Sequence, residues 1–255
     1  MMSSRRAFSL PEMMLVLTLF SLASTLIFHL LSDGFRKFRA VNSKNDTQQR
    51  MSKALSWLQR DLEKADSDQI GCKRISAPGN GDVIWFLSAE DPTQTNPDLR
   101  FIRDPASGMP RWQRHVIYYL IRPSNYPKVS GGYTAATDSD PRADYFAPHK
   151  LLIRKIVNRP GDPEKLMTAA QVDAFVTAPA DQNLAGLSSE PQVEACKLVA
   201  DGLLSLEATR YDRTLEVDLR AVHLERANAA LATGGVSLKT SPYTENQRLR
   251  VVLKR

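Results

Sequence analysis

A single carboxylate, Glu12, lies directly before a long apolar run, Met13 to Leu31, and two arginines, Arg5 and Arg6, precede it. An ionised carboxylate at the edge of a segment that can cross a bilayer is costly, because hydrocarbon offers it neither water nor hydrogen-bond donors. A carboxylate in that position needs a positively charged partner. The predicted chemistry is therefore charge pairing inside a membrane.

The apolar run has the length of a membrane span. Its nineteen residues reach about 28 Å as a helix. Short N-terminal segments usually stay in the cytoplasm, so we expect the residues after Leu31 to lie outside it. Two alternatives remain: Glu12 simply favours the first turn of a helix, or the run is an ordinary secretory signal cleaved near Ser21-Leu22-Ala23.

Three aspartates form the one metal-like group in the sequence. Asp138, Asp140 and Asp144 have spacings that can contact a hard cation such as calcium. The segment lacks the glycine and the bidentate glutamate of an EF-hand loop, and Arg142 opposes a cation. A solvated loop is the preferred interpretation, and a calcium site is the alternative.

The two cysteines, Cys72 and Cys196, both follow the apolar run and so lie on the side where thiols can be oxidised. A disulfide between them would close a long loop and stabilise the fold. The sequence does not show whether the two residues meet, so both states stay open.

The sequence contains few patterns that are typical of enzymes. The four histidines share no metal-ligand spacing, and no glycine-rich phosphate loop or nucleophile-elbow sequence is present. We therefore predict that the protein is not an enzyme and needs no cofactor. The net charge of +6 is scattered, and the one basic concentration, at residues 248–255, alternates with apolar residues as a terminal strand does, so nucleic-acid binding is not expected.

The elements that must position these groups begin with one long helix. No proline occurs between Glu12 and Ala77, and an amphipathic pattern continues to Ala65. A continuous helix from Glu12 to Ala65 would be about 80 Å long. Its apolar stripe consists of Met51, Leu55, Leu58, Leu62 and Ala65.

A β-rich domain follows this helix. Residues 66–82 contain three glycines and a proline and are typical of a loop. Short runs rich in β-branched and aromatic residues then predict antiparallel strands at 83–87, 99–103, 115–121, 151–157, 203–211 and 215–219. Residues 158–195 are interpreted as an insertion, with a helix over Leu166 to Phe175 that Asp162-Pro163-Glu164 caps. The predicted fold class is α+β.

The segment Ala7-Phe8-Ser9-Leu10-Pro11-Glu12-Met13-Met14-Leu15-Val16-Leu17 resembles the processing signal of type IV pilins and type II secretion pseudopilins. The resemblance implies that a prepilin peptidase cuts between Ala7 and Phe8 and methylates the new amine. Glu12 then becomes the fifth mature residue, and the Phe8 amine of one subunit can pair with Glu12 of a neighbour. The family usually has glycine where Ala7 stands and an aliphatic residue where Pro11 stands.

The stalk segment 54–62, the runs at 116–120 and 151–154, and the late alternating strands resemble a subset of this family, the J-type minor pseudopilins. The resemblance implies a pilin-like fold: a leader over 1–7, a membrane helix over 8–31, its amphipathic continuation over 32–65 and a head over 66–255. It also implies a structural subunit of the bacterial inner membrane that passes it once, with its head in the periplasm or outside.

The implied partners are the prepilin peptidase, other major and minor pilin or pseudopilin subunits, and the membrane. The subunit would join a short filament or its tip. A secretion pseudopilus, a type IV pilus and a DNA-uptake pilus share this chemistry. The alternative from another class is a signal-anchored or secreted binding module.

Overall fold

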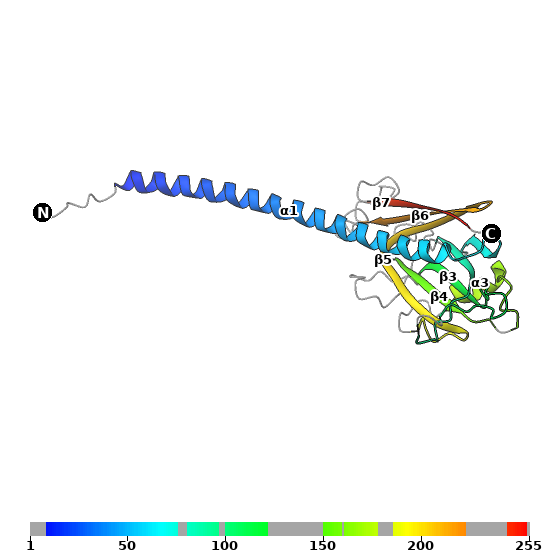
Figure 1. Cartoon of the computed structure of the whole chain (residues 1–255). Helices are drawn as coiled ribbons and strands as arrows, with labels where there is room; N and C mark the ends of the chain where they lie inside the picture. The colour runs from blue at the N-terminus through cyan, green and yellow to red at the C-terminus, as the bar shows by residue number, and fades with distance from the viewer. Residues whose placement is uncertain are drawn as a thin grey trace. The chain divides into compact units, whose positions relative to one another are not determined.

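The computed structural model describes residues 9–75, 81–96, 100–121, 150–159, 161–177, 186–222 and 244–253 (Figure 1). The chain divides into two compact units, residues 1–45 and 46–255. The elements are α1 (Leu10–Leu62), the 3-10 turn η1 (Ser67–Gln69), β1 (Ile70–Arg74), β2 (Asp82–Ser88), β3 (Arg114–Ile121), β4 (Lys150–Val157), α3 (Ala169–Val176), β5 (Val193–Tyr211), β6 (Thr214–Val222) and β7 (Thr244–Val252).

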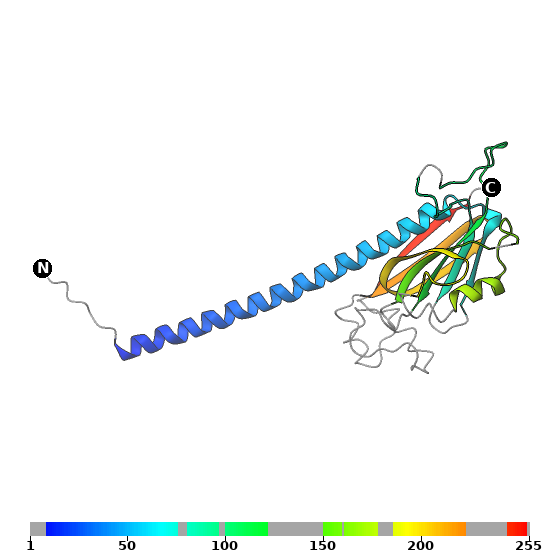
Figure 2. The ribbon, with the colours of Figure 1, turned by 90° about the horizontal axis from the view of Figure 1, so that it is seen from below.

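The seven strands form one antiparallel sheet in chain order, β1 to β7, and Figure 2 shows them side by side. Each strand pairs with the strand that follows it in the chain, which is the meander arrangement. One long helix and one curled antiparallel sheet confirm the α+β class.

The central strands are apolar on both faces. In β2, Ile84 and Phe86 contact the cluster that contains the end of α1, whereas Val83 and Trp85 contact a second cluster on the other face. Side chains on a strand alternate between faces, so a strand covered on both sides has a continuous apolar sequence. In contrast, β6 buries only alternate residues, Leu215, Val217 and Leu219.

The C-terminal part of α1 lies in the core of the second unit. Met51, Ala54, Leu58 and Leu62 are fully buried at steps of three and four residues, which place them on one side of the helix. The predicted stripe is confirmed, with Leu55 half-buried at its border. Burial of this stripe in the core makes the last turns of α1 a part of the folded head.

A buried ion pair joins this part of α1 to the sheet. The Arg154 Nε in β4 donates a hydrogen bond to Asp61 Oδ2 at 2.6 Å, and the Tyr118 hydroxyl donates to the same oxygen at 2.7 Å. Arg154 Nη2 also donates to Glu90 Oε2 at 2.7 Å. The exposed side-chain fractions are only 6% for Arg154 and 3% for Asp61. Burying both charges is costly, and these charge-assisted hydrogen bonds offset the cost.

The protonation states of these groups suit the contacts. Burial lowers the pKa of Arg154, but the carboxylates of Asp61 and Glu90 raise it by more, so the guanidinium stays ionised. Burial and the Asp61 charge raise the pKa of Tyr118, so its hydroxyl remains a donor.

The predicted insertion forms the cover of the other sheet face. Met167, Val172 and Val176 are buried there, and the Trp85 indole Nε1 donates to the Met167 carbonyl at 2.8 Å. The buried Lys155 Nζ donates to the Phe175 carbonyl and to Glu190 Oε2, both at 2.7 Å. These bonds attach α3 and the segment before β5 to the sheet.

The helix in this insertion begins later than predicted. Thr168, and not Asp162, is the residue before the first turn, and its amide donates to the Gln171 side chain at 2.9 Å. Leu166 and Met167 precede the helix and pack into the same apolar cluster as its buried residues.

Two strand predictions were wrong. Ile70–Arg74, expected to be a loop, is β1, and a side chain at Gly71 would clash with the Trp85 ring, since its Cβ would come within 2.2 Å. Glycine is needed there because the indole crosses the neighbouring strand. The expected strand 99–103 makes only isolated bridges, Glu90 to Phe101 and Arg103 to Pro110. Pro110 has no amide proton with which to continue a ladder.

The Arg154–Asp61 pair gives the first prediction. Arg154→Met leaves Asp61 buried without its cation, and we expect the free energy of unfolding to fall by about 3 to 5 kcal/mol. Denaturant titration of the full chain in detergent micelles measures this. The double variant Asp61→Leu/Arg154→Met should recover most of the loss. Arg248→Met, which breaks an exposed pair, is the control and should change little. Equal losses in the double and single variants would contradict the assignment.

His115 gives a second prediction. Its side chain is fully buried on the face that α3 covers, where its Nε2 lies 3.2 Å from the Met167 amide nitrogen. Burial lowers the pKa of His115 from 6.5 to about 4, although the Lys165 carbonyl raises it slightly. The folded protein therefore takes up this proton less readily than the unfolded chain. The stability from the neutral form is complete above pH 6.5 and is lost as pH falls toward 4.

We expect the free energy of unfolding to drop by up to about 3 kcal/mol between pH 6.5 and pH 4 through His115. Carboxylates also titrate in this range, so the measurement is the difference in pH dependence between the natural chain and His115→Gln. Identical pH dependence in the two proteins would show that His115 does not contribute.

Candidate assembly interface

The first turn of α1 is built around Glu12. Its Oε2 accepts hydrogen bonds from the Ser9 amide and from the Ser9 hydroxyl, both at 2.9 Å. Ser9 is the residue before the helix, and its carbonyl accepts the first helical bond, from the Met13 amide at 3.1 Å. The sequence Ser9-x-x-Glu12 has the spacing of a capping box, in which the glutamate returns to the cap residue. Sequence reasoning missed Ser9, although this spacing was readable.

Pro11 fits this turn because the helix loses no hydrogen bond there. It lies two residues before Met13, which donates the first helical hydrogen bond, so its missing amide proton removes no bond from the helix. The departure from the usual aliphatic residue therefore leaves the position of Glu12 at the start of the helix unchanged.

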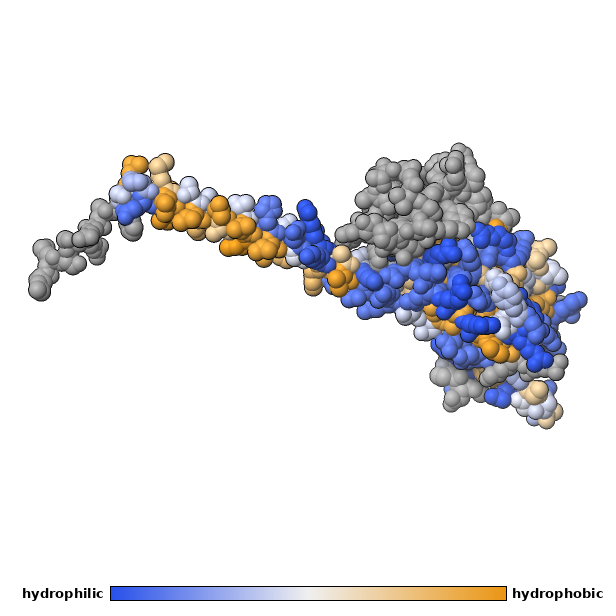
Figure 3. Space-filling model, turned by 90° about the horizontal axis from the view of Figure 1, so that it is seen from above, coloured by the Kyte–Doolittle hydropathy of each residue, from blue (hydrophilic) through white to orange (hydrophobic). Residues whose placement is uncertain are grey.

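The apolar run is exposed along its whole length. The large apolar side chains from Met13 to Leu31 expose between 55% and 73% of their surface. Figure 3 shows this part of α1 as the orange segment of the helix. Leu10–Leu62 includes a stretch with the length and composition to cross a membrane. A surface so apolar needs lipid or other apolar helices around it.

Three hydroxyl groups in this run donate hydrogen bonds to backbone carbonyls of the helix. Thr18 Oγ1 donates to the Met14 carbonyl at 3.0 Å, Ser21 Oγ donates to the Thr18 carbonyl at 3.0 Å, and Thr25 Oγ1 donates to the Ser21 carbonyl at 2.8 Å. A hydroxyl without a partner would be costly in hydrocarbon. These bonds make the run compatible with an environment free of water.

Among the described residues, Glu12 is the carboxylate at the N-terminal edge of this surface. Both of its hydrogen bonds end on Oε2, so Oε1 makes none to a described residue and can accept one from a partner. With this oxygen, Glu12 can form an ion pair with a positive charge on another molecule.

The other predicted site residues are distributed differently. Ala7 and Phe8 lie outside the described residues, and so do Asp138, Asp140 and Asp144. Within the described ranges, no group of three or more His, Cys, Asp or Glu side chains is placed to hold a metal ion. The cleavage and calcium predictions therefore stay predictions.

The fold does not bring the two cysteines together, and no disulfide joins them. Cys72 in β1 packs against the cluster on the helix side of the sheet, whereas Cys196 in β5 packs against the cluster on the opposite face. Three strands lie between β1 and β5 in the sheet order. Burial raises the pKa of Cys72, and the nearby Asp82 charge adds to this, so its thiol stays protonated.

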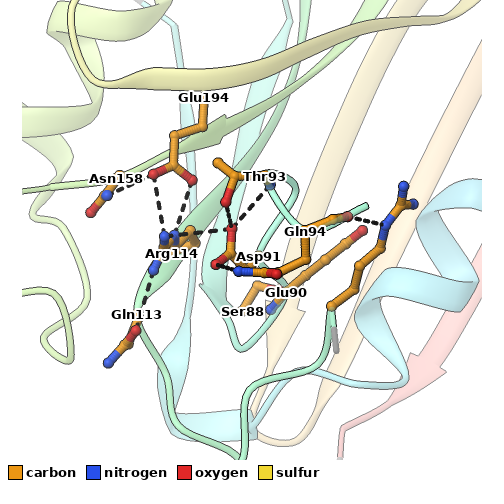
Figure 4. A network of polar contacts seen from close by, with 10 residues as sticks. Ser88, Glu90, Asp91, Thr93, Gln94, Gln113, Arg114, Asn158 and Glu194 are labelled. Atoms are coloured by element: carbon orange, nitrogen blue, oxygen red, sulfur yellow. Dashed lines mark hydrogen bonds and ion pairs between the residues drawn. The ribbon is translucent and has the colours of Figure 1, made fainter. Parts of the chain in front are cut away.

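A polar network at one end of the sheet is the densest group of charged side chains near β3 (Figure 4). Arg114 donates to both oxygens of Glu194, at 3.0 and 3.3 Å, and lies 3.7 Å from Asp91. Burial raises the pKa of Asp91, but hydrogen bonds from Thr93 and Gln94 and the charge of Arg114 lower it by more. The network holds the loop after β2 against β3 and β5, with Arg114 placed between the two carboxylates.

A cavity of about 460 Å³ lies beside α3. Its lining is Arg159, Met167, Gln171, Ala174, Phe175, Glu190, Pro191 and Gln192. Glu190 is paired with Lys155, and the described lining offers no nucleophile next to a base. The cavity gives no support to a hydrolytic or transfer reaction.

Comparisons with protein-family models, with curated proteins and with solved structures found no match to this chain. The function is therefore inferred from the chemistry of the residues described above.

Proposed function

We propose that the protein is a structural, non-catalytic subunit of the type IV pilin and pseudopilin class, held in the bacterial inner membrane by residues 8–31. A prepilin peptidase removes residues 1–7 by cutting between Ala7 and Phe8. The mature subunit then joins other pilin or pseudopilin subunits in a type II secretion pseudopilus or a type IV pilus, where the size of its head suits a position at the tip.

One observation carries this proposal. The exposed apolar surface of α1 begins at Glu12, whose Oε1 is available to a partner. A carboxylate at the edge of an apolar helix is stabilised when a positive charge from a neighbour approaches it in a medium of low polarity. The amine created at Phe8 is such a charge. Pairing Phe8 of one subunit with Glu12 of another sets the stagger between adjacent helices.

The head supports the same function. The last turns of α1 are buried in the core of the second unit, and the buried Asp61 is bonded to β3 and β4. The N-terminal part of α1 has an apolar surface that suits lipid, and its last turns belong to the core of the head. Such a helix can join a filament through its apolar part while the head stays folded. The head would then supply specificity for neighbouring subunits.

The first test is the mature N-terminus. When the chain is expressed with a prepilin peptidase in bacterial membranes, the mature protein should begin at Phe8 and carry a methylated amine. Its mass should be about 0.8 kDa lower, at the usual residue mass of about 110 Da. N-terminal sequencing and intact-mass spectrometry measure this. A control expression without the peptidase should keep Met1. An N-terminus at Ser24 would support a secretory signal instead, and an intact Met1 with active peptidase would contradict the proposal.

The second test concerns Glu12 itself. Glu12→Ala should leave cleavage largely intact, because the cut lies five residues earlier, and should reduce incorporation into filaments at least tenfold. Co-purification with the filament subunits, scored by immunoblot, measures incorporation. Asp33→Ala removes another exposed acid of the same helix and is the control. Normal incorporation of the Glu12→Ala protein would remove the assembly role assigned to this carboxylate.

A further inference from the structure

A row of cations lies on the solvent side of α1 within the second unit. Lys53, Trp57 and Arg60 follow one another at steps of four and three residues, so they share one face of the helix, and Lys64 follows in the turn just after α1 ends at Leu62. The three cationic residues are exposed and Trp57 is half-buried. Lys197 of β5 adds a fifth member beside Trp57. We call these five residues the basic stripe, and its helical part, from Lys53 to Arg60, runs about 10 Å along α1.

Trp57 holds two of these cations in place. The Arg60 guanidinium carbon and the Lys197 Nζ each lie 3.9 Å from the centre of the indole ring. Contacts of this kind are favourable because the ring face is negative. They keep two flexible side chains within about 8 Å of one another, a distance that follows from the two ring contacts. Two long side chains have thus lost part of their freedom before any partner arrives.

The charge of the stripe is not balanced within the described chain. Lys197 pairs in register with Arg154 on β4, so two like charges face each other across adjacent strands. The two acids near them, the buried Asp61 and the half-buried Glu90, both bond to Arg154. Arg60 reaches Asp61 only at 3.4 Å, on the oxygen away from Arg154.

The remaining acids do not neutralise it. Glu63 points from another face of α1 and bonds to Gln59 at 2.8 Å. Asp46, seven residues before Lys53, is the one exposed acid in line with the stripe. No carboxylate of the described residues lies within ion-pair distance of Lys53, Lys64 or Lys197. An external carboxylate would relieve the repulsion among these cations.

We propose that the basic stripe is a docking surface for an acidic helical segment of a partner protein. Lys53 and Arg60 lie two helical turns apart on one face of α1, with Lys197 beside Trp57 and Lys64 just after the helix, so a second helix with carboxylates every three or four residues can pair with these cations. Trp57 and Arg60 are of the residue types that most often dominate binding energy at protein interfaces. The surface lies wholly in the second unit, so it acts whether or not the N-terminal segment functions as proposed above.

Binding to a defined probe tests this. The full chain in zwitterionic detergent micelles is titrated against a fluorescein-labelled helical 20-residue peptide with glutamate at every fourth position and alanine or glutamine elsewhere. Fluorescence anisotropy gives Kd. The triple variant Arg60→Gln/Lys64→Gln/Lys197→Gln should raise Kd about tenfold or more, since each lost pair contributes up to about 1 kcal/mol.

A matched variant separates the stripe from the general positive charge of the chain. Arg103→Gln/Arg213→Gln/Arg250→Gln removes the same number of exposed charges elsewhere on the head and should leave Kd within about twofold of the original. Trp57→Leu keeps all the charges but frees Arg60 and Lys197, and should raise Kd about threefold by restoring their motion. Circular dichroism of each variant checks that its fold is retained.

Three outcomes would overturn the proposal. Equal weakening in the two triple variants would show that net charge alone binds the peptide. Equal binding of a peptide with glutamine in place of glutamate would show that carboxylates are not recognised. Tighter binding of a single-stranded RNA 20-mer, lost in the stripe variant, would assign the surface to nucleic acid. None of these results affects the N-terminus of the mature protein, so the two proposals fail separately.

Discussion

The buried contact between Asp61 and Arg154 is the constraint on which the arrangement of helix and sheet depends. Apolar side chains alone would let α1 rotate or slide over the sheet at little cost, because Leu58 and Leu62 can pack in more than one way. A buried carboxylate has no such freedom, since it needs both the Arg154 guanidinium and the Tyr118 hydroxyl. This interaction therefore selects one register of helix on sheet, and Trp57 and Lys197 owe their contact to it.

One helix thus meets two different environments. From Met13 to Leu31 it exposes apolar side chains, and the hydroxyls of Thr18, Ser21 and Thr25 bond to its own backbone, as suits a solvent without hydrogen bonds. From Met51 onward it buries a narrow apolar stripe and carries charges on the other faces, as a solvent-exposed helix of a globular domain does. The difference between the two parts lies in composition alone, since the backbone is helical throughout.

Much of the fold could be predicted from local sequence patterns, and the predictions that were wrong or missing have physical causes. The stripe around Leu58 was predicted because periodicity reports burial directly, and the strands β3 and β4 were predicted from their β-branched and aromatic composition, without their burial on both faces. β1 was missed because Gly71 is typical of a loop, whereas here it makes room for Trp85, a residue fourteen positions later. Asp61 looked like one more surface charge, since only tertiary structure brings Arg154 to it. For the candidate site, Ser9 was a local signal that could have been used, and the separation of Cys72 from Cys196 depends on strand order, which no spacing reveals.

The unbroken strand order has a consequence for how the head forms. Because every strand pairs with its chain neighbour, the sheet can grow one strand at a time, although long segments separate β3 from β4 and β4 from β5. Docking of α1 is the exception, since it joins residues 61 and 154, so the closure of that large loop is expected to come late. We expect the sheet to form first and α1 to dock onto it afterwards. The burial of Asp61 is then the step that makes folding cooperative.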